Sequence, residues 1–236
     1  MAIIGIDIGG SKIRGILWNG WRVIRALEFP LPKNKNDLKK RIVALISLLS
    51  RQELIGGIGI GAAGIVGKTT LISSPNIPYI KNFSFRSLWL RPMVLRVDND
   101  ARAFARAELL KGAGRGAKCL FALTIGTGIG RAYGINGKVI RVKKFEYPEP
   151  WEKEYQAIRN GRDDKRLANF LGEKLSPLLK PFDPEVIVVG GGIMERHGFL
   201  PRLETAFKAR DVTAKVRRAT FRKNGVAIGA ALLLSD

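Results

Sequence analysis

The hydrophobic positions near the N-terminus predict one strand followed by a hairpin. Residues 2–8 are almost continuously apolar and lead into a polar, glycine-rich turn at residues 9–11. Two alternating segments, 13–18 and 23–27, follow on either side of Asn19-Gly20, a pair that is typical of tight hairpin turns. Alternation with a period of two places one face of each strand in a core.

The same pattern occurs a second time in the middle of the chain. An apolar strand is predicted at residues 118–124, a glycine turn at 126–128, and a hairpin over 129–142 that turns at Asn136-Gly137. Two copies of strand, glycine turn and hairpin in one chain indicate a duplicated lobe.

The remaining patterns predict helices and short strands around these two copies. Leucine and isoleucine recur at helical spacing between residues 38 and 49, which predicts an amphipathic helix that covers a sheet. Asp98-Asn99-Asp100 can cap an alanine-rich helix over residues 101–110. Further strands are expected at 58–60, 94–97, 185–189 and 214–217, and further helices within 151–179 and from Val226 onward.

Composition excludes several classes of protein. The hydrophobic share of 46% in 236 residues is enough for packed cores, and no apolar run reaches the roughly 20 residues that span a bilayer. One cysteine, Cys119, and one histidine, His197, cannot build an internal disulfide or an ordinary zinc site. We therefore expect no zinc. The N-terminus lacks the pattern of a secretory signal, so we expect a cytoplasmic protein.

The formal net charge of +21 attracts polyanions such as nucleic acids electrostatically. Lys and Arg are nevertheless spread along the whole length, and no aromatic-interleaved RNA-binding motif accompanies them. We therefore interpret them as a solvated basic surface and do not expect a nucleic-acid partner. A charged, short-looped chain with one cysteine also suits a thermophile.

Two segments match nucleotide-binding motifs in spelling, but the residues around them do not fit those motifs. Gly59, Gly61 and Gly64 imitate a dinucleotide-binding fingerprint, but no helix is predicted next and position 81 is a lysine rather than an acidic residue. Gly67-Lys68-Thr69 imitates the end of a P-loop, but the leading glycine is replaced by Ala62.

Three glycine turns, each directly after a predicted strand, form a more coherent set. They are Asp7 to Ser11, Thr124 to Gly130 and Gly190 to Gly192. Glycine lets phosphate oxygens approach backbone N–H groups, and the hydroxyls of Ser11 and Thr127 can add donors. Asp7 at a strand end can hold a hydrated Mg²⁺ ion. The alternative is that these are ordinary hairpin turns.

These motifs resemble those of the ROK family of sugar kinases and related repressors, within the actin-like ATPase fold. The similarity lies in six segments that run nearly from one end of the chain to the other. They are Asp7 to Lys12, Ser74 to Ile77, Asn99 to Ala101 with Gly112 to Gly116, Leu123 to Gly130, Val186 to Ile193, and the small-residue terminal segment Gly225 to Ala231. The resemblance implies an α/β fold of two ribonuclease-H-like lobes, each a mixed sheet flanked by helices, with a cleft between them. We expect the lobes at 1–97 and 98–236, with a terminal helix near 225–234 that packs back on the first lobe.

The resemblance also implies a role for each motif. Asp100 is expected to be the general base that accepts the proton of the attacking sugar hydroxyl, with Asn76 and Asn99 on other hydroxyls. From the residues alone, Asp100 could instead be a simple helix cap, and Asp98 is a competing carboxylate. The expected ATP-binding residues are Gly9, Gly10, Ser11, Lys12, Thr124, Gly126, Thr127, Gly128, Gly191 and Gly192.

The chain departs from the family after its second hairpin. A Gly-Glu-x-Gly-His motif and a cysteine-rich zinc motif are absent, and the segment from Phe145 to Tyr155 stands in their place. Glu152 is our candidate for a later sugar-contacting glutamate, with Glu146 and Glu154 as alternatives. Arg131 replaces a glycine that commonly follows the second phosphate loop.

The sequence therefore predicts an ATP-dependent kinase for a hexose or amino sugar, similar to glucokinases and N-acetylhexosamine kinases. A small sugar is the expected partner, a homodimer is compatible with this hypothesis, and no membrane is involved. Two alternatives stay open: an ATPase or kinase of the same fold with a non-sugar substrate, and a non-catalytic ligand-binding or nucleic-acid-binding descendant.

Overall fold

The computed structural model describes residues 1–88 and 93–234, which form two compact units. One unit comprises Met1–Ala107 and Lys223–Asp236, and the other comprises Glu108–Arg222. The division falls inside helix α2 (Asp100–Lys111), about ten residues later than the boundary at 97 and 98 drawn from the sequence. The segment from Lys223 onward returns to the first unit.

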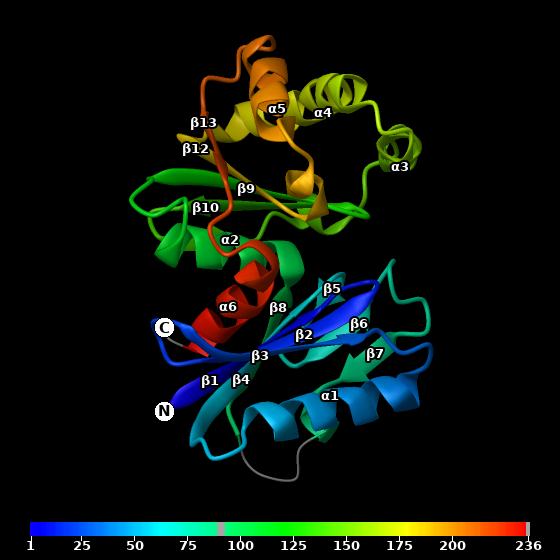
Figure 1. Ribbon diagram of the computed structural model, residues 1–236, viewed down its shortest axis with the longest axis vertical. Helices are drawn as coiled ribbons and strands as arrows, with labels where there is room; N and C mark the ends of the chain where they lie inside the picture. The colour runs from blue at the N-terminus through cyan, green and yellow to red at the C-terminus, as the bar shows by residue number, and fades with distance from the viewer. Residues whose placement is uncertain (89–92, 235–236) are drawn as a thin grey trace. The chain divides into compact units, whose positions relative to one another are not determined.

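A five-stranded mixed sheet forms the centre of the first unit (Figure 1). Its order is β3-β2-β1-β4-β8, in which β1, β4 and β8 run parallel and the β2–β3 hairpin continues antiparallel from β1. The strands are β1 (Ala2–Ile8), β2 (Lys12–Trp18), β3 (Val23–Pro30), β4 (Ile55–Ala62) and β8 (Leu95–Asn99).

Two helices cover this sheet. Helix α1 (Lys35–Leu49) buries Leu38, Ile42, Leu45, Ile46 and Leu49 against it, as the helical spacing predicted. Asn34 caps the helix, since its side chain accepts a hydrogen bond from the Asp37 N–H at 2.9 Å. Helix α6 (Gly225–Ala231) packs against β1 and β4. A separate three-stranded sheet, β5-β6-β7, consists of Ile65–Val66, Thr70–Ser73 and Lys81–Ser84.

Helix α6 approaches the sheet so closely that only glycine fits beneath it. A Cβ atom on Gly5 would lie 1.9 Å from the Ala227 carbonyl oxygen, and one on Gly59 would lie 1.8 Å from that of Ala230. These are distances that no side chain can tolerate without moving the helix. Packing in this unit therefore requires glycine at positions 5 and 59.

The second unit repeats the sheet of the first. Its order is β11-β10-β9-β12-β13, with β9, β12 and β13 parallel and the β10–β11 hairpin antiparallel to β9. The strands are β9 (Cys119–Ile125), β10 (Ile129–Ile135), β11 (Lys138–Ile140), β12 (Val186–Gly190) and β13 (Lys215–Arg218). The same strand order and directions in both units confirm the duplication predicted from the sequence.

Three helices contribute apolar residues to the core of the second unit: α3 (Glu152–Asn160), α4 (Asp164–Leu179) and α5 (Phe199–Lys208). The helical region predicted within 151–179 is thus two helices. It breaks because Arg162 adopts a left-handed conformation with φ 58°, and Asp163 then caps α4 by accepting the Arg166 N–H at 2.9 Å. Short 3₁₀ turns lie at Arg86–Leu88, Lys143–Glu146, Lys180–Phe182, Gly192–Glu195, Arg222–Asn224 and Leu232–Leu234.

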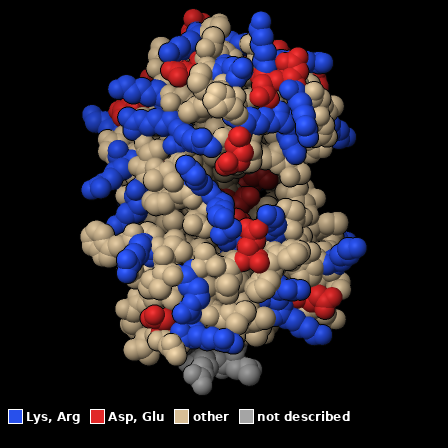
Figure 2. All heavy atoms as spheres, in the orientation of Figure 1, with Lys and Arg blue, Asp and Glu red and all other residues tan. Residues whose placement is uncertain are grey.

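Within the described residues, no helix combines the length and the apolar character needed to cross a membrane. Figure 2 shows Lys and Arg side chains spread over the visible face and interspersed with Asp and Glu. This distribution agrees with the even spread of basic residues along the sequence.

Candidate active site

The parallel strands of the first unit place several predicted site residues at one edge of the sheet. Ile8, Ala62 and Asn99 lie in one row at the ends of β1, β4 and β8. The row before it contains Asp7, Gly61 and Asp98. Because the carboxyl ends of parallel strands share an edge, residues more than 90 positions apart in the sequence become neighbours here.

Asp100 lies close enough to Asp7 to affect the ionisation of Asp7. Burial, and then the negative charge of Asp100, raise the pKa of Asp7 from 3.8 to about 8, while the Arg14 guanidinium acts in the opposite direction. Burial also raises the pKa of Asp100, against hydrogen bonds from backbone N–H groups that lower it. Two buried carboxylates whose pKa values are both raised form a site that attracts protons or a cation.

The structure separates the roles of Asp98 and Asp100. Asp98 accepts hydrogen bonds from Arg102 Nε at 2.6 Å and from Arg106 Nη2 at 2.9 Å. Asp100 forms no ion pair within residues 1–88 and 93–234, and its Oδ1 accepts the Ala101 N–H at 2.9 Å. Asp98 is therefore held in a structural ion-pair network, whereas the Asp100 carboxylate keeps an oxygen for other chemistry.

The Ser74–Ile77 loop and the end of β8 bring the two predicted asparagines to the same edge. A Cβ on Gly10 would lie 2.8 Å from Asn76 Cβ, so the first glycine turn and the Ser74–Ile77 loop are in contact. Asn99 Nδ2 donates to the Gly64 carbonyl at 3.1 Å, and its Oδ1 accepts the Ala101 N–H at 3.0 Å. Asn99 therefore also caps α2.

Sequence reasoning placed Ser74 in the motif Ser74 to Ile77 but gave a role only to Asn76, two residues further on. Its side-chain oxygen is buried and has no hydrogen-bond partner among the described residues. A buried hydroxyl without a partner costs free energy unless a ligand satisfies it. Ser74 thus becomes a further candidate contact for a hydroxylated ligand.

The first glycine turn leaves its polar side chains exposed. Ser11 is exposed, and Lys12 Nζ forms an ion pair with Glu28 Oε1 at 2.7 Å. Gly9 N donates to the Lys12 carbonyl at 3.0 Å, which closes the turn between β1 and β2.

The second and third glycine turns come together in the second unit. Thr124 on β9 lies beside Gly190 on β12, and Gly191 has φ 92°. A Cβ on Gly191 would lie 2.4 Å from the Ile125 carbonyl oxygen, so only glycine fits there. Nothing lies within 4 Å of the Cβ positions of Gly126 and Gly192, so both backbones can be approached by a ligand.

Glu152 lies in the second unit, next to the second glycine turn. Its Oε1 accepts hydrogen bonds from Arg131 Nη2 at 2.8 Å and from the Glu149 N–H at 3.0 Å. Its Oε2 lies 3.9 Å from the position that a Cβ of Gly128 would occupy. One carboxylate oxygen of Glu152 is thus engaged in an ion pair that the sequence did not indicate.

The residues present fit a sparsely coordinated Mg²⁺ ion rather than a dedicated metal cage. No group of three or more His, Cys, Asp or Glu that could hold a metal occurs in the described parts of the chain. The negative charge of Asp100 contributes to the raised pKa of Asp7, and a bound cation would offset the repulsion between the two carboxylates. Mg²⁺ commonly keeps several waters and needs only one or two carboxylates.

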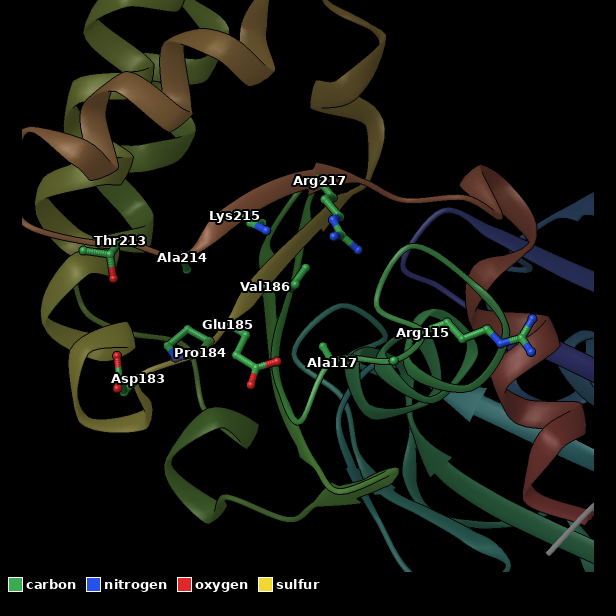
Figure 3. Close-up of a pocket in the computed structure, with 11 residues that line it drawn as sticks. Arg115, Ala117, Asp183, Pro184, Glu185, Val186, Thr213, Ala214, Lys215 and Arg217 are labelled. Carbon is green, nitrogen blue, oxygen red and sulfur yellow. The ribbon is translucent and has the colours of Figure 1, made fainter.

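A separate pocket of about 540 Å³ lies in the second unit, where β9, β12 and β13 begin. In Figure 3, Lys215 and Arg217 project from β13, and Glu185 reaches toward Ala117. Glu185 Oε2 accepts the Lys118 N–H at 2.9 Å, and Arg217 Nη1 donates to the Ala113 carbonyl at 2.8 Å. These side chains secure the turn before β9, at the opposite strand ends from the glycine turns.

The raised pKa of Asp7 predicts that Asp7→Asn stabilises the protein without nucleotide or metal. The folded state binds an extra proton at Asp7 between pH 3.8 and about 8, so folding stability falls as pH rises through this window. We expect a gain of roughly 1–3 kcal/mol at pH 8, which is a few degrees in Tm, and a smaller gain at pH 5. Thermal unfolding of both proteins across pH 5 to about 8.5 measures it. A variant that melts lower than the wild type at pH 8 would refute the argument.

The duplicated five-stranded sheets, each with a glycine turn after its first strand, define an actin-like ATPase fold. The model of the ROK family matches residues 3–144 and 163–236, and the chain belongs to this family. The fold and family predictions are thus confirmed. The match omits residues 145–162, which contain α3.

Several relatives of this chain are sugar kinases. The chain is 31% identical over 144 residues to a glucokinase of Streptomyces coelicolor, a match that covers 58% of this chain and 45% of that protein. It thus spans about half the length of that relative. The ROK glucokinase of Streptomyces griseus, solved with glucose and AMPPNP, superposes with a TM-score of 0.83 at 23% identity, over 99% of both chains.

A second solved structure is an inorganic polyphosphate/ATP-glucomannokinase of Arthrobacter sp. strain KM. It superposes with a TM-score of 0.80 at 26% identity, and the match covers 99% of this chain and 98% of that chain.

Proposed function

We propose that this protein transfers the γ-phosphoryl group of ATP to a hydroxyl of a hexose or amino sugar, with Asp100 as the general base. The observation that carries the proposal is the Asp100 carboxylate, which has no ion pair among the described residues and lies beside Asp7 at a strand edge that also holds Asn76 and Asn99. Membership in the ROK family and similarity to glucokinases support the substrate class.

The chemistry asks for few protein groups. Phosphoryl transfer depends mainly on alignment and on stabilising negative charge, and the base only has to accept the proton of the attacking hydroxyl. The raised pKa of Asp100 makes its carboxylate a better proton acceptor than an exposed aspartate. Asn76, Asn99 and the unpaired hydroxyl of Ser74 supply hydrogen-bonding groups for the other sugar hydroxyls.

The glycine turns are assigned to the nucleotide. Gly126 to Gly128 and Gly191-Gly192 would bind phosphates and adenosine through backbone N–H groups other than that of Gly126, which donates to the Gly128 carbonyl at 3.0 Å, and the first turn would add Gly9 to Lys12. Asp7 would hold Mg²⁺ through water, and the ion would neutralise phosphate charge. Glu152 remains a candidate sugar contact through its Oε2 atom, since Oε1 is engaged with Arg131.

The test is ADP release from Mg-ATP with a panel of hexoses, amino sugars and N-acetylated sugars, against a control without sugar. Sugar-dependent release identifies the acceptor class. Release that is independent of every sugar would point to a non-sugar acceptor. No release, with steep salt-dependent binding to DNA in a gel assay, would favour a non-catalytic descendant.

A second phosphoryl donor, inorganic polyphosphate, is favoured by the net charge of +21. A long polyanion is attracted by a basic surface, and one relative of similar fold is a polyphosphate/ATP kinase. The same sugar panel with polyphosphate instead of ATP, read out as sugar phosphate, tests it. Activity with polyphosphate should fall steeply with added salt, whereas absence of sugar phosphate at low salt would exclude this donor.

A further inference from the structure

Helix α3 lies in the segment 145–162 that the family match omits, yet it contacts the second glycine turn. Tyr155 on α3 donates its hydroxyl hydrogen to the Gly126 carbonyl at 2.6 Å. Gln156, the next residue, donates from Nε2 to the Thr127 carbonyl at 3.4 Å, which is a longer and weaker contact. Two successive carbonyls of the turn therefore face α3.

The orientation of these carbonyls decides where the following N–H groups point. In a trans peptide the C=O and the next N–H lie in one plane and point in opposite directions. Holding the Gly126 carbonyl toward α3 therefore directs the Thr127 N–H away from it, and the Thr127 carbonyl does the same for the Gly128 N–H. Successive N–H groups that point to one side make an anion-binding concavity.

A buried ion pair fixes α3 beneath this turn. Arg131 is 3% exposed and lies on β10, and its Nη2 donates to Glu152 at 2.8 Å and to the Tyr147 carbonyl at 2.9 Å. Its guanidinium also lies 5.9 Å from the Trp151 ring centroid. The pair therefore joins the first turn of α3 to the strand that follows the glycine turn.

Tyr155 is suited to hold a carbonyl permanently. Its side chain is fully buried, and burial raises the pKa of its hydroxyl to about 12, so the hydroxyl keeps its hydrogen across the working pH range.

We propose that Arg131, Glu152, Tyr155 and Gln156, here called the α3 brace, are positioning residues that hold the 126–128 turn in its phosphate-binding conformation. The proposal deepens the proposed function and rests on it, because it assumes that this turn binds the phosphates of ATP. It assigns to segment 145–162 a role in nucleotide binding that the family model does not cover.

The decisive variant is Tyr155→Phe, which removes one hydrogen bond and keeps the ring. Its matched control is Tyr133→Phe, since Tyr133 donates to Cys119 Sγ at 3.5 Å on the neighbouring strand and does not touch the turn. Calorimetry would measure Kd for Mg-ATP and for adenosine with both variants and the wild type. We expect Tyr155→Phe to weaken ATP binding by about five- to tenfold, a loss typical of one buried hydrogen bond, with adenosine binding unchanged.

Equal weakening of ATP and adenosine binding by Tyr155→Phe would reduce Tyr155 to a structural role and overturn the proposal. An ATP affinity within twofold of the wild type would do the same. Should Tyr155→Phe unfold, Gln156→Ala is the substitute, because Gln156 is exposed and its contact is weaker. It should weaken ATP binding by about twofold with no change in Tm, and an unchanged ATP Kd would count against the brace.

Hydrogen exchange of the peptide that covers residues 124–130 separates this proposal from the proposed function. Without any ligand, Tyr155→Phe should speed the exchange of this peptide, and Tyr133→Phe should not. Faster exchange in a protein that binds no ATP would support the brace and refute the nucleotide assignment. Unchanged exchange in a protein that binds ATP would refute the brace alone.

Discussion

Replacement of Asp100 by Asn is expected to lower kcat of sugar phosphorylation by at least about a hundredfold, while KM for ATP stays within a few-fold of the wild type. The amide cannot accept the proton of the attacking hydroxyl, and its shape leaves the site intact. The Ala101 N–H that Asp100 Oδ1 accepts at 2.9 Å can be accepted equally by the amide oxygen. Steady-state kinetics with the sugar from the panel, together with the Tm of both proteins, measures this result.

Asp98→Asn is the matched control for this prediction, because the neighbouring aspartate has the opposite environment. Its carboxylate pairs with Arg102 and Arg106, and removal of its charge takes one ion-pair partner from each of these two guanidinium groups. We expect a loss of about 2–4 kcal/mol in stability with kcat of the folded protein within tenfold of the wild type. If Asp98→Asn lost turnover and Asp100→Asn kept more than about a tenth of it, Asp98 would be the base.

Gly59→Ala is expected to destabilise the first unit by at least about 3 kcal/mol, or roughly 6–12 °C in Tm. The new methyl group would lie 1.8 Å from the Ala230 carbonyl oxygen and 2.4 Å from its carbon. Helix α6 has no room to absorb this on its other side, because a Cβ on Gly229 would already lie 1.6 Å from the Ala103 carbonyl oxygen. Thermal and chemical denaturation measure the effect.

Gly67→Ala is the control, since the nearest atoms to its Cβ position are 4.0 Å away. We expect its stability to remain within about 0.5 kcal/mol of the wild type. A Gly59→Ala protein as stable as Gly67→Ala would mean that α6 does not pack tightly on β4 in solution.

Much of the first unit's candidate site follows from local sequence signals. The apolar run of β1, the glycine turn after it and the capping residues before α2 each specify their own conformation through short-range preferences. The position of Asp7 at a strand end suggested its role with Mg²⁺, and the resemblance to the ROK family supplied the role of Asp100. Their roles stay proposals, while the family itself is confirmed.

In the second unit, local sequence signals do not predict every feature of the structure. The helical patterns within 151–179 set no boundary between helices, because the polar run at residues 159–166, where α3 ends and α4 begins, gives no periodic signal that fixes the break at Arg162. Arg131 and Glu152 are 21 positions apart, and nothing in either local pattern indicates that they form an ion pair. Their pairing depends on how α3 packs on the sheet.

By itself, the sequence determined the type and order of most strands and helices, the duplication and the three glycine turns, because periodicity and turn chemistry act over a few residues. Only the tertiary structure decided which carboxylate is paired and which is not, as Asp98 and Asp100 show. The tertiary structure also decided that Tyr155 bonds to the Gly126 carbonyl and that α6 lies too close to Gly5 and Gly59 for any side chain there. These outcomes depend on distances between segments remote in sequence, which are set by the packing of side chains in the core rather than by local preference.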